Sequence, residues 1–135
     1  MRYEFSPEWT LRAKEIAKAL KMDYIEPDRI ACVKSQGSKS RRTIARIHTI
    51  GKVMQLGMQQ KPFYTIELIT EQFDRPAHTL ELKERTIVHE LMHIPEGFKG
   101  GFRQHRPFVT QKKVEEMFRE LQEARKIQQT KTNYT

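Results

Sequence analysis

The sequence has one cysteine, no long apolar run and no apolar region at its start. A lone Cys32 excludes an internal disulfide and fits a reducing cytosol. It stands in the apolar run 30–33, which predicts a core position rather than a nucleophile. Met1 leads directly into Arg2-Tyr3-Glu4 without a signal region, and no apolar run approaches the roughly 18 residues that span a bilayer. With a length of 135 residues, these absences predict one cytoplasmic domain without a membrane span.

Acidic residues are absent from two stretches, although the whole chain holds 17 of them against 25 basic ones. The first stretch lies between Asp28 and Glu67, and the second runs from Gly97 to Val114. Their basic residues are Arg29, Lys34, Lys39, Arg41, Arg42, Arg46, Lys52 and Lys61, then Lys99, Arg103, Arg106, Lys112 and Lys113. The formal net charge is +8. The two segments could form a basic rim near the active site that attracts nucleic acid or acidic peptides. The alternative is an ordinary solvated surface.

The pattern His-Glu-x-x-His occupies residues 89–93 and is the strongest chemical signal in the chain. On a helix, residues four apart share a face, so His89 and His93 can bind one metal ion without distorting the backbone. Glu90 then lies beside the metal, where it can take a proton from an attacking water. Apolar residues fill the other positions from Ile87 to Ile94, which predicts a buried helix. Buried imidazoles need a partner, and a metal ion supplies one.

A third ligand is expected just beyond this helix. Pro95 ends the helix, and the pair Gly100-Gly101 lets the chain turn back. His105 follows within reach, and three protein ligands with one open position are typical of catalytic zinc. We therefore predict a Zn²⁺ site formed by His89, His93 and His105.

Further contacts to the oxyanion or the substrate have three candidates, and the sequence does not choose among them: Arg103, Arg106 and Tyr64. The expected strand 63–68 could bind an extended polypeptide by edge pairing. His78 precedes the motif helix and is predicted to be a surface residue. No role is assigned to three residues that fit an ordinary solvent face: Arg46, His48 and Glu67.

Apolar periodicity predicts an α+β fold. Helices are expected at residues 7–21, from about 80–83 to 94, and at 110–127, and strands at residues 29–34, 43–48 and 63–68; residues 54–58 fit a loop or a short strand. This order predicts a small mixed sheet of three to four strands packed on the motif helix, with helices at both ends. Residues 1–127 form the predicted single domain, followed by a polar tail at 128–135.

Several of these segments resemble a known family. The run His-Glu-Leu-Met-His-Ile-Pro (89–95) is followed by Phe98-x-Gly-Gly-Phe-Arg-x-His105, and the loop 35–41 and Ala45-Arg46-Ile47 add weaker similarity. Over residues 25–110 the chain resembles the metallopeptidases of phages and archaea, minimal zincins similar to SprT-like proteases. The resemblance implies that the three histidines bind the metal and that Glu90 is the catalytic acid/base. It implies no particular substrate. The sequence shows no separate C-terminal zinc-binding or DNA-binding region, which weakens the case for DNA–protein crosslink repair.

The resulting functional prediction is a zinc metallopeptidase that hydrolyses a polypeptide substrate with a water activated by the metal and Glu90. Two alternatives remain open. One is a nucleic-acid-binding module with a structural zinc, supported by the basic segments. The other is a non-catalytic zincin that serves as a scaffold for protein binding. An intact Glu90 favours the peptidase, and a structural zinc site would usually be closed by four protein ligands.

Overall fold

The computed structural model describes the backbone of residues 1–134 and the side chains of residues 1–131. Its strands are β1 (Arg2–Phe5), β2 (Ile30–Gln36), β3 (Ala45–Thr49) and β4 (Tyr64–Ile69). Its helices are α1 (Pro7–Ala19), α2 (Lys52–Met58), α3 (Thr70–Phe73), α4 (Leu80–Met92), α5 (His105–Phe108) and α6 (Gln111–Tyr134), with a 3-10 turn η1 at Pro27–Arg29. The α+β class predicted from the sequence is confirmed.

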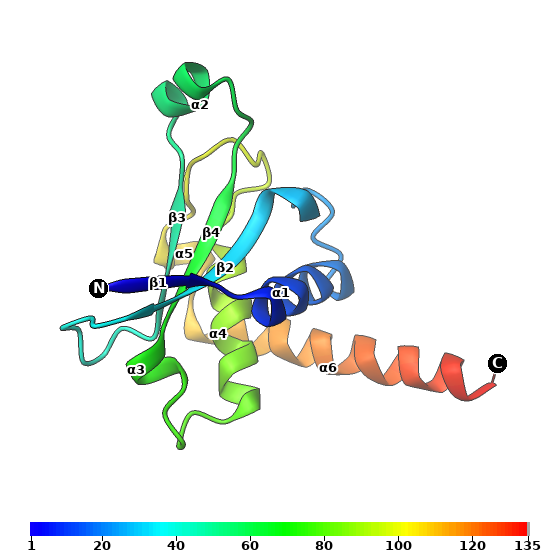
Figure 1. Cartoon of the computed structure of the whole chain (residues 1–135). Coiled ribbons are helices and arrows are strands. Elements are labelled where there is room, and N and C mark those ends of the chain that lie inside the picture. Colours follow the sequence, from blue (N-terminus) through cyan, green and yellow to red (C-terminus); the bar gives the residue numbers. More distant parts are fainter. Residues whose placement is uncertain (135) are drawn as a thin grey trace.

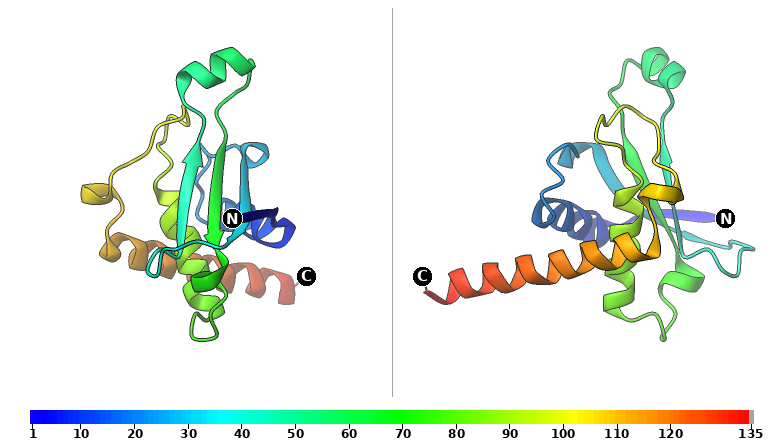
Figure 2. Two further views of the ribbon diagram at one scale, coloured as in Figure 1. Left: turned by 60° about the vertical axis from the view of Figure 1, so that its left-hand side comes forward. Right: turned by 180° about the vertical axis from the view of Figure 1, so that it is seen from behind.

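The strands form one mixed sheet in the order β1-β2-β4-β3. β2 and β4 pair in parallel, whereas β1 and β3 pair antiparallel at the two edges. Tyr64, Ile66 and Leu68 of β4 share one face and are buried, as their alternation predicts. Helices α1 and α4 lie against the sheet, and α6 packs on both of them (Figures 1 and 2).

Helix α1 begins where the sequence places it. The Ser6 side chain accepts a hydrogen bond from the Trp9 N–H at 3.3 Å, and Pro7 occupies the first turn. Trp9, Ala13 and Ile16 are buried on one stripe of the helix. The helix ends at Ala19, before the predicted residue 21, because Lys21 has a φ of 57° and cannot continue an α-helix.

Two elements differ from the sequence prediction. Residues 52–58 form helix α2, so the loop or short strand predicted for 54–58 is wrong. A surface helix normally buries its apolar residues, but those of α2 face solvent and its buried residue is Gln55. Strand β1 was not predicted, although its four residues alternate charged and aromatic side chains, because the segment is short and all its residues are exposed. That strand forms by pairing with β2, from Arg2 opposite Gln36 to Phe5 opposite Val33.

Helix α6 continues to Tyr134, beyond the predicted end at residue 127. The predicted polar tail 128–135 is therefore helical over its described part, and Thr135 lies outside the described residues. The buried side chains Val114, Phe118 and Leu121 belong to the first part of the helix. Apolar periodicity marks only this packed part, so it ends the helix too early. No described helix is both long enough and apolar enough to cross a membrane.

A buried carboxylate fastens the edge strand β3 to β4. The Glu67 side chain accepts hydrogen bonds from Ser35 Oγ at 2.6 Å and from Arg46 Nε at 3.2 Å, and its Oε1 lies 2.8 Å from His48 Nε2. Burial would raise the pKa of Glu67, but the hydrogen bonds from Ser35, His48 and Arg46 hold that pKa below its usual value. Glu67 is thus no ordinary solvent-face residue, because it links β2, β3 and β4.

The loop between α4 and α5 is tied to the tip of the sheet. The Tyr64 hydroxyl donates to the Gly101 carbonyl oxygen at 2.7 Å and accepts from the Gly100 N–H at 2.9 Å. Gln55 Nε2 donates to the Lys99 carbonyl oxygen at 2.9 Å. The buried Phe98 ring packs on Tyr64, with ring centroids 5.0 Å apart. These contacts fix the segment that leads from His93 to His105.

Replacing Gly100 should loosen this attachment. Gly100 has a φ of 104°, and a Cβ there would collide with the Gln55 side-chain amide and lie 2.8 Å from the Ile50 carbonyl oxygen. Gly100→Ala should therefore lower the free energy of unfolding by about 1–3 kcal/mol. Gly101→Ala is the matched control, because a Cβ there meets nothing within 4 Å. Urea denaturation checks this, and equal stability of the two variants would contradict it.

Candidate metal centre

Helix α4 places the first two histidines. Its start is capped by Thr79, whose hydroxyl accepts a hydrogen bond from the Leu82 N–H at 3.3 Å. Ile87, Val88 and Leu91 are fully buried against the sheet and the other helices. His89 lies in the last turn of α4, and His93 is its C-terminal capping residue. Packing of the apolar positions therefore sets the direction in which both imidazoles point.

The chain after α4 returns His105 to the same place. The Arg103 N–H donates to the His93 carbonyl oxygen at 2.7 Å, and the His93 Nδ1 lies 2.8 Å from the Arg103 carbonyl oxygen. A carbonyl oxygen only accepts, so His93 Nδ1 carries the proton in this contact. His105 follows two residues later, at the start of α5. The prediction that the chain turns back after Pro95 to deliver His105 agrees with this path.

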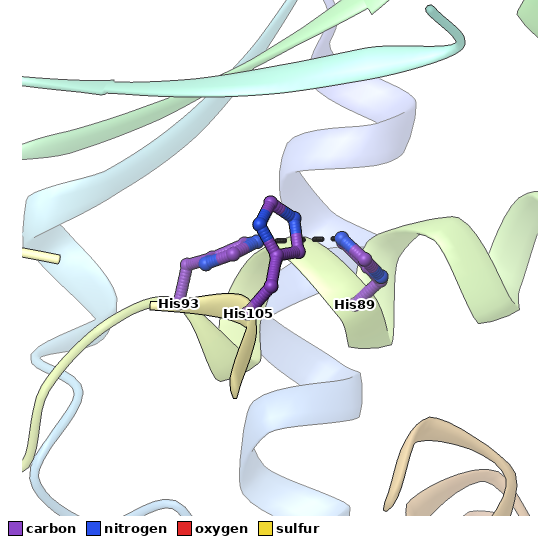
Figure 3. A group of neighbouring side chains, drawn as sticks. All are labelled: His89, His93 and His105. Carbon is purple, nitrogen blue, oxygen red and sulfur yellow. Dashed lines mark hydrogen bonds between the residues drawn. The ribbon is translucent and has the colours of Figure 1, made fainter. Parts of the chain in front are cut away.

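The three imidazoles converge. One ring nitrogen from each of His89, His93 and His105 lies within 4.8 Å of the others. The Nε2 atoms of His89 and His93 are 3.3 Å apart, and the His93 and His105 ring centroids are 4.6 Å apart. Figure 3 shows the three rings turned toward one another beneath the strands of the sheet. The structure thus brings together the three residues that the sequence predicts as ligands.

Electrostatics keep two of these rings neutral near neutral pH. Burial, together with the neighbouring His93 and His105, lowers the pKa of His89 to about 4. Burial and His105 lower the pKa of His93, although its contact with the Arg103 carbonyl acts in the opposite direction. A neutral imidazole has a free lone pair on one nitrogen, which is the form that binds metal ions.

Glu90 lies beside this group with its side chain almost fully buried. Burial raises the pKa of its carboxyl group to about 7, which suits a group that exchanges protons at neutral pH. Glu90 and His89 line one cavity of about 500 Å³. The cavity is also lined by the residues before β3, Arg42, Thr43 and Ile44, and by the first residue of β3, Ala45.

The three residues predicted to contact the oxyanion or the substrate differ in whether their side chains already have partners in the protein. Tyr64 is buried, and its hydroxyl is already bonded to Gly100 and Gly101, so its observed role is to hold the loop. Arg103 pairs with Glu96 at 3.4 Å, and its guanidinium lies 5.4 Å from the centre of the Phe108 ring. Arg106 is exposed.

Two further residues border the cavity, His78, which no sequence signal identified, and Arg42, which belongs to the first acid-free stretch. His78 lines it, although His78 is half-buried rather than a free surface residue, and its Nδ1 lies 2.8 Å from the Phe73 carbonyl oxygen. Arg42 is exposed at its rim, so at least one member of the first acid-free stretch lies beside the site. Arg42 comes from the loop before β3, and His78 from the segment between α3 and α4.

The strand available for edge pairing is not the one predicted. β4, which includes most of the predicted strand 63–68, is bonded to β2 on one side and to β3 on the other. A central strand has no free N–H or C=O groups for a further partner. β3 is one of the two edge strands, and its first residue Ala45 lines the cavity with His89 and Glu90.

The fold and these residues define an α+β protein with a three-histidine candidate metal site and a buried carboxyl group beside it. Residues 1–129 match the family described as "Putative phage metallopeptidase". The match covers nearly the whole chain, so the protein belongs to this family, which confirms the resemblance to phage metallopeptidases. Membership supports a metal-dependent peptidase that acts on polypeptides. No curated protein and no solved structure matches the chain. The similarity to SprT-like proteases stays a prediction.

Proposed function

We propose that the protein is a zinc metallopeptidase in which His89, His93 and His105 bind the metal and Glu90 is the general base. The observation that carries this proposal is the convergence of three ring nitrogens within 4.8 Å beside a buried carboxyl group. The family supports a metal-dependent peptidase, and these residues suggest which metal and which base.

The donor set suits zinc. Two nitrogens on a tetrahedral Zn²⁺ at about 2.0–2.1 Å lie roughly 3.3–3.4 Å from each other. The Nε2 atoms of His89 and His93 are 3.3 Å apart. His93 is oriented by its Nδ1 contact with the Arg103 carbonyl, which leaves Nε2 as the ligand atom, a common arrangement around metal-binding histidines. Three ligands with no thiolate among them are typical of a catalytic rather than a structural zinc site.

The chemistry divides between the metal and the protein. A zinc ion held by the three imidazoles would lower the pKa of a water toward about 7 and polarise the substrate carbonyl. Glu90 accepts a proton from the attacking water and then delivers it to the leaving amine. Arg103 and Arg106 remain the candidates to stabilise the developing oxyanion. Arg103 would have to leave its ion pair with Glu96, whereas Arg106 forms no ion pair among the described residues.

The edge of β3 gives the substrate a place to bind. An extended polypeptide could pair with its free backbone groups, which brings a peptide bond near Glu90 at the cavity that Ala45 lines. Glu67 holds β3 in register from the other face of the sheet through Arg46 and His48. A fixed edge strand favours binding because less conformational entropy is lost.

The two alternative functions receive less support. A nucleic-acid-binding module rests on the acid-free segments alone, and no comparison supports it. A non-catalytic scaffold has no need for a carboxyl group whose pKa is raised to about 7 in the cavity that His89 also lines.

Metal removal tests the proposed activity. Hydrolysis of a fluorescein-labelled unfolded protein should disappear after chelation and dialysis, and one equivalent of Zn²⁺ should restore it. The reason is that three converging imidazoles form a metal site with an open position. Mg²⁺ is the control ion, because it prefers oxygen ligands and should not restore activity. Full hydrolysis by the metal-free protein would contradict the proposal.

A further inference from the structure

Helix α2 is built with its polar side inward. Of its seven residues only Gln55 is buried, whereas Val53 is 82% exposed, Met54 55%, Leu56 70% and Met58 50%. Short helices normally bury their apolar face, so this arrangement does not serve the core. Exposed apolar residues gathered on one element are typical of a binding surface. We call these four residues the apolar tip.

The apolar tip is held in a fixed position. Gln55 Nε2 donates to the Ile50 carbonyl oxygen at 2.8 Å and to the Lys99 carbonyl oxygen at 2.9 Å. Gly100, which has room for no side chain next to Gln55, allows this close approach. One polar side chain therefore ties α2 to the loop that carries His105. A surface ordered before binding loses less entropy when a partner arrives.

The apolar tip also continues the edge of the sheet. β3 begins at Ala45, beside His89 and Glu90, and ends at Thr49, two residues before Gly51 caps α2. Figures 1 and 2 show α2 at the end of the sheet where β3 ends and β4 begins, away from α1, α4 and α6. An extended chain advances about 3.3 Å per residue, so a polypeptide paired along β3 from the cavity reaches α2 after roughly five residues.

The charges around the apolar tip narrow the choice of occupant. Lys52 and Lys61 flank it, and no acidic residue lies between Asp28 and Glu67. Two copies of the chain would bring like charges together at this point, which disfavours self-association through α2. A substrate segment with apolar and acidic side chains complements both features.

We propose that the apolar tip is an exosite that binds an apolar segment of the polypeptide substrate, roughly five residues from the bond that is cleaved. This inference rests on the proposed peptidase function. It narrows the substrate class to extended or unfolded chains with exposed apolar side chains, because folded proteins bury such segments.

The first test is a binding measurement that needs no hydrolysis. Glu90→Gln protein is titrated with labelled 12-residue peptides. One group carries Leu-Phe-Leu at the N-terminus or at the C-terminus, and the other carries Ser-Gln-Ser at the same positions. Peptides with an apolar end should bind about tenfold more tightly, since burying two or three apolar side chains is sufficient for that difference. Val53→Gln/Leu56→Gln should abolish the preference, because Gln keeps the helix and removes the apolar surface. Ile127→Gln, at another exposed apolar position on α6, is the control and should keep it.

The second test separates this inference from the proposed function. In the zinc-loaded enzyme, the paired Gln substitutions should raise KM for the apolar-ended peptides and leave cleavage of a six-residue peptide unchanged. Absence of all hydrolysis would count against the peptidase, while the binding preference would still support the exosite. Equal binding of the apolar and polar peptides would overturn the exosite. Binding to anionic phospholipid vesicles that depends on Val53 and Leu56, without a peptide preference, would overturn it in favour of a lipid surface.

Discussion

Glu90→Gln should leave the protein folded and able to bind zinc, but it should lower kcat by about 10²–10⁴-fold. Gln has nearly the same shape as Glu, yet it cannot accept a proton from water. The Glu90 carboxyl group is buried, and burial raises its pKa to about 7, so its main chemical property is proton exchange near neutral pH. Steady-state kinetics on a labelled peptide measure this effect, with zinc content determined on the same sample.

Stability separates the catalytic role of Glu90 from a structural one. Replacing a buried carboxyl group of raised pKa by a neutral amide should not lower stability at pH 7, because the amide carries no charge to desolvate. Thermal unfolding of the metal-free proteins checks this. A Glu90→Gln variant that is stable, loaded with zinc and fully active would refute the assignment of the general base.

His105→Ala should weaken zinc binding by more than the roughly 10–100-fold that loss of a hydrogen-bonded partner of a ligand usually causes. The variant keeps only His89 and His93, whose Nε2 atoms are 3.3 Å apart and can hold the ion by two bonds. Activity should fall in parallel at limiting zinc. Competition with a fluorescent chelator gives the affinity.

A second histidine substitution controls for nonspecific effects. His48→Ala also removes an imidazole, but the His48 ring contacts Glu67 rather than the three-histidine group. Its zinc affinity should match that of the unaltered protein. Unchanged affinity in His105→Ala would mean that another residue completes the site. Glu115, the first carboxylate after His105 in the sequence, is poorly placed for that role because it is already paired with Arg85.

The histidine group was predictable because its first part is local. His89 and His93 share a helix face by geometry alone, and the surrounding apolar residues predict that this helix is buried. His105 required one further assumption, that the chain reverses after Pro95. The reversal depends on contacts that the sequence does not display, above all those of Tyr64 and Gln55 with the residues 99–101.

Long-range pairing explains most of the differences. β1 has only four residues, which are too few for their alternation to predict a strand, and it forms by pairing with β2. Edge pairing was expected at residues 63–68, but β4 is central and β3 lies at an edge. Strand order decides this, and alternation within one strand cannot reveal it. Helix α2 does not show the usual apolar pattern because its one buried side chain is polar: Gln55 holds the helix by two hydrogen bonds. Where the sequence breaks the usual burial rule, a functional surface is a reasonable expectation.

The central claim is that one zinc ion is bound by three histidines, and anomalous diffraction from zinc-loaded crystals at the zinc absorption edge tests it most directly. A single peak per chain is expected, about 2.0–2.1 Å from one ring nitrogen of each of His89, His93 and His105. No peak at the three imidazoles, or a peak at other side chains, would contradict it.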